Sequence, residues 1–311
     1  MERISTSSAY NGVLNNLMAA ETQQTNIGNQ ISSEQTASDL QGYASNAETL
    51  TAMQSVQAQV TGYLNNSQIT ATELSTQDTA LTQIGAAANS ASSAVTTALA
   101  AGNGDTLMQS LQNAYQNAVQ GLNTTFNGNY VFSGGNTNTT PVTVADMTGL
   151  PTALAANTVF TNEQHINTSQ VTATTSVQTG FLASSLGGPL FNALSTIQAY
   201  VNTNGPFSGT LTAAQTTFLQ GQIAGLDAAG TGLTTATSQN GLAQSQVKSA
   251  QDALTSQQST LTGMISNITS VNLAQASSDL SQAQLAVQAS SRVFEALQSS
   301  SLMAILTASG H

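Results

Sequence analysis

Few residues in this sequence could do chemistry, and they do not stand in a catalytic pattern. There is no cysteine, which excludes a thiol nucleophile, a disulfide framework and a cysteine metal site. The two histidines, His165 and His311, lie far apart, and Glu163 beside His165 lacks the third ligand that a metal ion would need. His165 is therefore expected to be a solvated loop residue.

Other short motifs are also explained by structure alone. The run GNGDT at 102–106 is similar to part of a phosphate-binding loop, but it lacks a third glycine, a lysine and a preceding strand. The acids are scattered singly, without an acid–base pair. Asn-x-Ser/Thr triplets at Asn123, Asn138 and Asn167 are expected by chance in a chain this rich in Asn and Thr. The sequence therefore predicts that the protein is not an enzyme and binds no cofactor or metal.

The charge balance excludes further classes of function. Only 5% of the 311 residues are charged, against roughly 25% in typical soluble domains. The net charge is −11, and the three basic residues are Arg3, Lys248 and Arg292. So few cations cannot neutralise nucleic-acid phosphates, and anionic membrane surfaces would repel the chain. The start of the sequence has no apolar signal-peptide core, so we expect a cytosolic protein or export without a cleaved signal.

The placement of proline divides the chain into three parts. Proline is costly inside helices, so proline-free segments can form long ones. Residues 1–140 and 207–311 contain no proline. The sequence therefore predicts two helical arms around a middle segment that holds Pro141, Pro151, Pro189 and Pro206.

Apolar residues in both arms recur at intervals of three and four, as in a coiled-coil seam. The front stripes are Tyr10, Leu17 and Ile31 with Val13, Ala20 and Ile27, then Leu74, Leu81, Ala88 and Val95 with Ile84, Ala91 and Ala98. The back stripes are Val247, Leu254, Leu261 and Ile268, then Leu273, Leu280, Val287 and Phe294 with Ala276, Ala283, Ser290 and Leu297. The pattern predicts antiparallel helices over 46–99, 105–125 and 212–271, and a matched terminal pair over 1–31 and 273–306.

Turn and cap signals set the expected ends of these helices. Ser38 or Asp39 is a candidate N-cap for the helix that follows the break at 32–45. Asp105, after a glycine turn, is the candidate cap of the third helix. The stripe changes register near Asn272, where we expect the last helix to begin.

The middle segment changes to β-branched and aromatic runs bounded by Gly, Asn and Pro. Asn127-Gly128 predicts a turn, followed by a short strand at Tyr130-Val131-Phe132. The runs TPVTVADM, NTVFTNEQHIN and SQVTATTSVQTGFL continue in this style and predict a small antiparallel β module. A helix at 186–203 then leads back towards the last arm.

Together these features predict a mainly α fold. It is an elongated antiparallel helical coiled-coil bundle formed by both termini, with a small β-rich module inserted in the middle. The expected domains are a terminal coiled-coil assembly domain (1–45 and 272–311), a helical core (46–127 and 206–271) and a β-rich outer domain (128–205).

Three segments resemble one family. RISTSSAYNGVLNNLMAAETQQTNIGNQIS at 3–32 and LSQAQLAVQASSRVFEALQSSSLMAIL at 280–306 resemble the opening and closing helices of the flagellin family of bacterial axial proteins. FNGNYVFSGGNTNTTPV at 126–142 is similar to a segment of that family's hook-associated proteins (type 3), which lie at the hook–filament junction. The resemblance covers about 1–142 and 240–306 and leaves the middle unmatched.

The resemblance implies a structural part of the flagellum, an adaptor at the hook–filament junction on which flagellin assembles. It implies an extracellular protein exported by the flagellar type III apparatus without a cleaved signal. The implied partners are further copies of the chain, other hook-associated proteins, flagellin and an export chaperone. The residues expected to carry assembly are Leu14, Leu17, Ile27, Ile31, Leu280, Val287, Phe294 and Leu297.

Three alternatives stay open at the level of sequence. A filament-forming flagellin would share both ends of the chain and differ in polymerising alone into long filaments. A secreted surface adhesin would use the β module to bind glycans or host surfaces. A cytosolic coiled-coil scaffold is disfavoured because the seam lacks the flanking charges that set partner choice.

Overall fold

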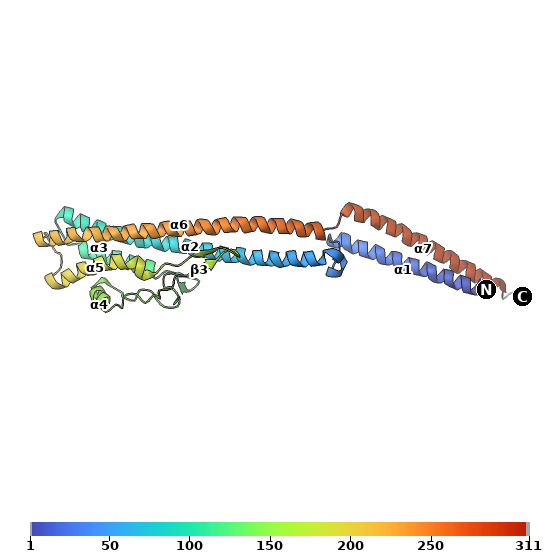
Figure 1. Ribbon diagram of the computed structural model, residues 1–311, viewed down its shortest axis with the longest axis horizontal. Helices are drawn as coiled ribbons and strands as arrows, with labels where there is room; N and C mark the ends of the chain where they lie inside the picture. Colours follow the sequence, from blue (N-terminus) through green and yellow to red (C-terminus); the bar gives the residue numbers. More distant parts are fainter. Residues whose placement is uncertain (1, 309–311) are drawn as a thin grey trace. The chain divides into compact units, whose positions relative to one another are not determined.

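The computed structural model describes residues 2–308, with the side chains of residue 8 and of residues 10–299. Long helices dominate it, which confirms the mainly α class (Figure 1). The helices are α1 (Glu2–Ser33), α2 (Ala47–Ala101), α3 (Leu107–Leu122), α4 (Leu150–Ala155), α5 (Ala183–Asn204), α6 (Ala213–Thr269) and α7 (Leu273–Ala308), with 3₁₀ helices η1 (Leu40–Asn46) and η2 (Met147–Gly149). The strands are β1 (Thr125–Phe126), β2 (Asn129–Tyr130), β3 (Thr168–Gln170) and β4 (Ser176–Gln178).

The chain forms two compact units. The first contains the described residues up to Ala58 and from Ser259 onward, and the second contains Gln59–Gln258. Helices α2 and α6 contribute to both. In the second unit they run antiparallel, because residues later in α2 meet residues earlier in α6: Asn240 Nδ2 donates to the Leu74 carbonyl, and Ser92 Oγ donates to Asp227.

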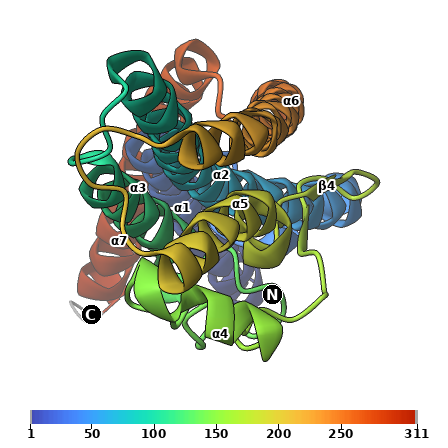
Figure 2. The same ribbon diagram turned by 90° about the vertical axis from the view of Figure 1, so that its left-hand side faces the viewer.

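The core of the second unit is built from the predicted stripes. Leu74, Leu81, Ala88 and Val95 of α2 are all buried, as are Val247 and Leu254 of α6. Figure 2 looks along these helices and shows α3 and α5 beside α2, with α4 beyond α5. The seam holds many alanines, so helix backbones approach closely. At Gly121 of α3, an added Cβ would lie 2.6 Å from Cγ1 of Ile84.

The opening of the middle segment is a β-hairpin. Asn127 and Gly128 have φ of 49° and 82°, the left-handed pair that a two-residue type I′ turn requires. They join β1 to β2, with Phe126 paired to Asn129. The strand ends at Tyr130, so the prediction that it runs to Phe132 is wrong. Phe132 is fully buried, and its carbonyl accepts a hydrogen bond from the Ala183 N–H beside an isolated antiparallel bridge between Ser133 and Leu182.

The rest of the middle segment contains less strand than its composition suggests. Of the three later runs, only SQVTATTSVQTGFL forms a hairpin, β3–β4, with Ser169 paired to Val177. The predicted strand in TPVTVADM is wrong. A single bridge joins Val142 to Phe160, and the Asp146 carboxylate accepts hydrogen bonds from backbone N–H groups to begin η2. The local cap at Asp146 therefore starts a short 3₁₀ turn where the β-branched composition predicted a strand.

The hairpin β3–β4 packs on helices α2 and α6. Its Val171 and Val177 are buried against Leu74, Ala243 and Val247. On α2, Ser67 Oγ donates to the carbonyl of Val171 at 3.1 Å, and Gln77 Nε2 donates to the carbonyl of Thr179. The small sheet is thus part of the helical body, held by buried polar and apolar contacts.

The predicted caps have mixed outcomes. Asp39 is an N-cap, but of η1, since its carboxylate accepts from the Gly42 N–H and α2 begins only at Ala47. The prediction that Asp105 caps α3 is wrong. The N-cap is Thr106, and the Asp105 carboxylate accepts a 2.6 Å hydrogen bond from the Gly209 N–H. That bond joins the loop before α3 to the loop before α6.

Candidate assembly interface

The terminal helices α1 and α7 pack side by side in the first unit (Figure 1). A small cluster near the end of α1 holds them: Ile27, Ala276 and Ala283 are buried, with Ile31 and Leu280 packed against them. Asn272 caps α7, because its Oδ1 accepts hydrogen bonds from the Ala274 and Gln275 N–H groups. This agrees with the register change expected there.

The eight residues predicted to carry assembly all lie within this pair of helices. Ile27 is buried, and the other seven are half-buried: Leu14, Leu17, Ile31, Leu280, Val287, Phe294 and Leu297. Phe294 packs against Tyr10 across the pair, with ring centroids 4.9 Å apart and planes inclined by 41°. Ile27, Ile31, Leu280 and Phe294 thus help hold the two terminal helices together. The part of all eight residues in contacts between copies of the chain stays a prediction.

The outer faces of the same helices carry apolar residues that the stripe pattern does not single out. Met18 of α1 is 57% exposed, and Leu285 and Val293 of α7 are 65% and 49% exposed. A shallow groove along α1 runs past Met18, Thr22 and Asn26. A heptad pattern emphasises the seam, so it misses these side chains. Large apolar residues outside the stripe were the signal that could have found them.

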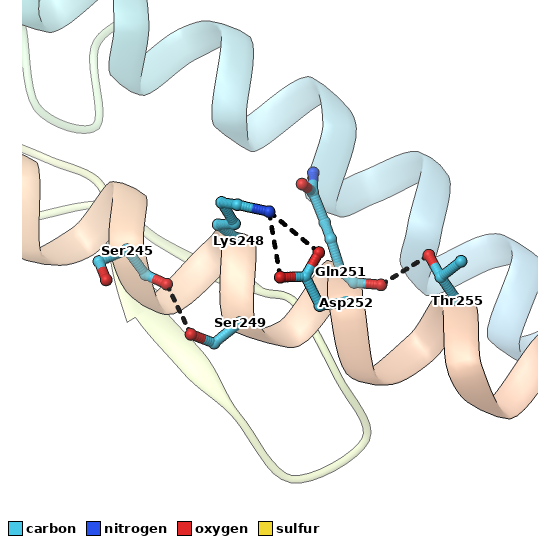
Figure 3. A network of polar contacts seen from close by, with 6 residues as sticks. All are labelled: Ser245, Lys248, Ser249, Gln251, Asp252 and Thr255. Atoms are coloured by element: carbon cyan, nitrogen blue, oxygen red, sulfur yellow. Dashed lines mark hydrogen bonds and ion pairs between the residues drawn. The ribbon is translucent and has the colours of Figure 1, made fainter.

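The ion pair between Lys248 and Asp252 contributes little to the stability of this protein. Figure 3 shows Lys248 Nζ bonded to both carboxylate oxygens of Asp252, one turn along α6, at 3.0 and 3.1 Å. Both side chains are largely exposed, and such a pair is worth about 0.3–0.5 kcal/mol. The neighbouring bonds drawn in Figure 3, such as Ser249 Oγ to the Ser245 carbonyl, lie within the helix. The hydrogen bonds and the ion pair drawn there therefore act within α6.

The few perturbed ionisable groups have local structural causes. The Gly209 N–H, helped by the Asn103 amide, holds the pKa of Asp105 below its ordinary value. Hydrogen bonds from the Thr148 hydroxyl and the Gly149 N–H lower the pKa of Asp146. Burial raises the pKa of Tyr115, whose hydroxyl donates to the Val144 carbonyl at 2.8 Å, and burial also raises the pKa of Glu73. Each of these groups is explained by the fold around it.

The described residues hold no group of three or more His, Asp or Glu side chains placed to bind a metal ion. His165 is exposed in a loop, as expected, whereas His311 lies outside the described residues. None of the helices over residues 2–308 is long and apolar enough to cross a membrane.

Comparison with known proteins shows which proteins this chain is similar to. Residues 223–306, most of α6 and nearly all of α7, match the family model of the bacterial flagellin C-terminal helical region. A Vibrio parahaemolyticus protein described as a flagellar hook-associated protein superposes with a TM-score of 0.59 at 15% identity, covering 72% of this chain and 97% of its own. The chain has the fold of the flagellar hook-associated proteins. FlgL from Bacillus cereus superposes with a TM-score of 0.53 at 14% identity, covering 70% of this chain and 99% of its own.

No curated protein matches the sequence. The match to the flagellin region spans α6 from residue 223 to the C-terminal helix, and so includes Leu280, Val287, Phe294 and Leu297. The hook-associated fold extends over about seven tenths of the chain, and nearly all of each hook-associated structure is accounted for.

Proposed function

We propose that the protein is a structural axial component of the bacterial flagellum, the adaptor at the hook–filament junction on which flagellin assembles. The observation that carries the proposal is the near-complete coverage of two hook-associated structures by this fold. The segment FNGNYVFSGG, which opens the middle part with the β1–β2 hairpin, supports a junction protein over a filament flagellin. The absence of a metal-binding cluster among the described residues is compatible with a mechanical role.

The terminal helices are the parts best suited to join copies of the chain. Their packed cluster is small, with three buried residues, and both helices leave large apolar side chains exposed. Burying an exposed leucine is worth about 1.5–3 kcal/mol. Copies packed through α1 and α7 would cover Met18, Leu285 and Val293 and stabilise the pair as they assemble.

The proposed partners follow from this role. They are further copies of the chain, the neighbouring hook-associated proteins, flagellin and an export chaperone. The proposed location is the extracellular flagellum, reached through the flagellar export apparatus without a cleaved signal. The three proposed domains are the terminal coiled coil, the helical core and the middle part at 128–205, whose buried side chains join the apolar cluster of the core.

Electron microscopy of the purified protein under polymerising conditions tests the proposal. We expect rings, short oligomers or monomers, and we expect hook-bearing cells lacking the protein to release unpolymerised flagellin. Long filaments formed by the protein alone would establish the alternative, a filament flagellin, which would share the C-terminal helical region. Normal filaments on cells that lack the protein would overturn both the adaptor role and the filament alternative.

A further inference from the structure

Both helical arms are interrupted at the same level, and the two interruptions pair with each other. In the first unit α1 ends at Ser33 and α6 ends at Thr269, and Figure 1 shows the two breaks side by side. Gln35 forms an antiparallel bridge with Ser270. The Thr36 N–H donates to the Thr269 carbonyl at 2.8 Å, and the Val271 N–H donates to the Glu34 carbonyl at 3.0 Å. The two connectors therefore form a minimal two-stranded ladder.

Each connector is also tied to the helix beside it. Gln30 Nε2 near the end of α1 donates to the Thr36 carbonyl at 2.7 Å, which ties the front connector to α1. The Thr36 hydroxyl adds a further bond between the connectors, to the Ser270 carbonyl at 3.3 Å. On the other connector, Val271 joins the apolar cluster of Ile27 and Ala276. The ladder is thus continuous with the packed part of the α1–α7 pair.

On the side that faces α2 and α6, the ladder has few buried contacts. Among the described residues, no hydrophobic side chain is buried between Ile27 and Leu50, or between Leu254 and Ala276. The 3₁₀ helix η1, which follows the front connector, has no buried residue. Glu34 and Ala44 adopt φ of 57° and 46°, values that cost non-glycine residues energy. Segments with few buried contacts open at low free energy, and hinges are built from a few such residues.

We propose that the paired connectors, Glu34–Thr36 and Thr269–Val271, are one joint about which α1 and α7 swing together relative to the ends of α2 and α6. Because the two connectors are hydrogen-bonded to each other, a change of backbone torsion in one connector displaces the other. Two independent pivots would instead shear α1 against α7 and open the cluster of Ile27, Ala276 and Ala283. The joint lets the terminal pair reorient while that cluster stays closed. The inference concerns the single chain and does not rest on the flagellar role.

An engineered disulfide tests the pairing. The chain has no cysteine, so Gln35→Cys with Ser270→Cys introduces the sole pair of thiols. Bridge partners lie about 4.5–5.5 Å apart at Cα, within the range that a disulfide spans. We expect rapid, nearly complete closure on mild oxidation. The control is Ser38→Cys with Ser270→Cys, which moves one thiol three residues out of register. Equal closure of both variants would overturn the pairing.

Spin-label distances test the joint motion in the wild-type background. Labels at exposed Asn29 and Ser278 span α1 and α7, and should give a narrow distribution. A second protein carries labels at Asn29 and Gln54, on the two sides of the front connector. A third carries labels at Ser278 and Ser259, on the two sides of the back connector. Both pairs should give broad distance distributions. Breadth on one side only, or narrow distributions on both, would overturn the common joint. So would an α1–α7 distribution as broad as the other two.

Discussion

Single exposed side chains decide how this protein can meet other molecules. Leu285 of α7 and Leu242 of α6 are 65% and 66% exposed, so neither contributes much to the fold of its own chain. Only Leu285 lies on the terminal helices that the proposed function assigns to assembly. The two leucines therefore form a matched pair for experiment.

We predict that Leu285→Ser raises the protein concentration needed for assembly by about tenfold or more. The basis is the roughly 1.5–3 kcal/mol gained when a leucine is buried. Thermal unfolding of the monomer should not change. Leu242→Ser serves as the control and should assemble as the wild type does. Light scattering during assembly measures both. If Leu242→Ser impairs assembly as much as Leu285→Ser, the contact surface lies elsewhere.

Asp105 makes one contact of the fold sensitive to acid. Its carboxylate accepts from the Gly209 N–H, and this lowers its pKa in the folded state below the ordinary value of 3.8. A lowered folded pKa means that the stabilisation is complete above the ordinary value, and is lost as the pH falls through the lowered one. We predict that the free energy of unfolding of the wild type falls over that window more steeply than that of Asp105→Asn. Urea titrations at a series of pH values give both slopes. Parallel curves would contradict the prediction.

At the scale of elements, the spacing of helices is set by small residues. Gly121 of α3 faces Ile84 and the Ala80 carbonyl, which an added Cβ would approach to 2.6 and 3.2 Å. Gly221 of α6 is also helical, but an added Cβ there would meet nothing within 4 Å. The same substitution should therefore have opposite effects at the two positions.

We predict that Gly221→Ala stabilises the protein by about 0.5–1 kcal/mol, because alanine loses less backbone entropy in a helix. Gly121→Ala should destabilise it by about 1–3 kcal/mol, the usual cost of overpacking. Chemical denaturation measures both. A gain in stability for Gly121→Ala would show that α2 and α3 can separate freely.

How far the sequence predicts these elements depends on where each element finds its partners. The long helices lie within a few residues of their predicted bounds, because proline-free stripes record local spacing that every turn repeats. Asp105 was misassigned because its true partner, Gly209, is 104 positions away, and a cap signal looks the same with or without it. The strand prediction for TPVTVADM is wrong for a similar reason, because Val142 and Met147 are buried in the core without forming a ladder of strands.

The candidate interface was predicted only in part. The stripe led to the eight residues that lie within the terminal pair, since a period of three and four records the side facing the partner helix. It could not single out Met18 or Val293, because an exposed apolar residue has no periodic signal of its own. The sequence shows only that these apolar residues lie outside the stripe, and the structure adds that nothing among the described residues covers them.

For the whole molecule, the middle segment cannot be treated as a detachable attachment. One continuous apolar cluster contains Ile84 of α2, Phe132, Leu150, Phe191 and Leu226. The predicted outer domain at 128–205 supplies three of these five residues. The helices of the second unit therefore depend on the middle segment for their packing.

We predict that deleting residues 128–205 abolishes cooperative unfolding, because the remaining helices would expose the faces that Phe132 and Phe191 cover. The control is a short insertion after Ala173, at the exposed tip of the β3–β4 hairpin, which should leave the melting temperature unchanged. Circular dichroism with thermal melting compares the two. A deletion variant that still melts cooperatively would show an independent helical core. It would also make binding assays on that variant a fair test of the adhesin alternative.

The alanine-rich seam also determines which substitutions this protein tolerates. Cores of large side chains are damaged mainly by truncation, which leaves cavities. Here Ala87, Ala88, Ala91 and Ala118 are buried, and a truncation can remove only a methyl group from each. Substitutions by larger side chains should be the damaging ones, because valine or leucine at these positions would push whole helices apart. A complete substitution scan of α2 should therefore show an inverted profile, with bulky apolar residues excluded from the most buried positions and polar exchanges accepted over most of the outer surface.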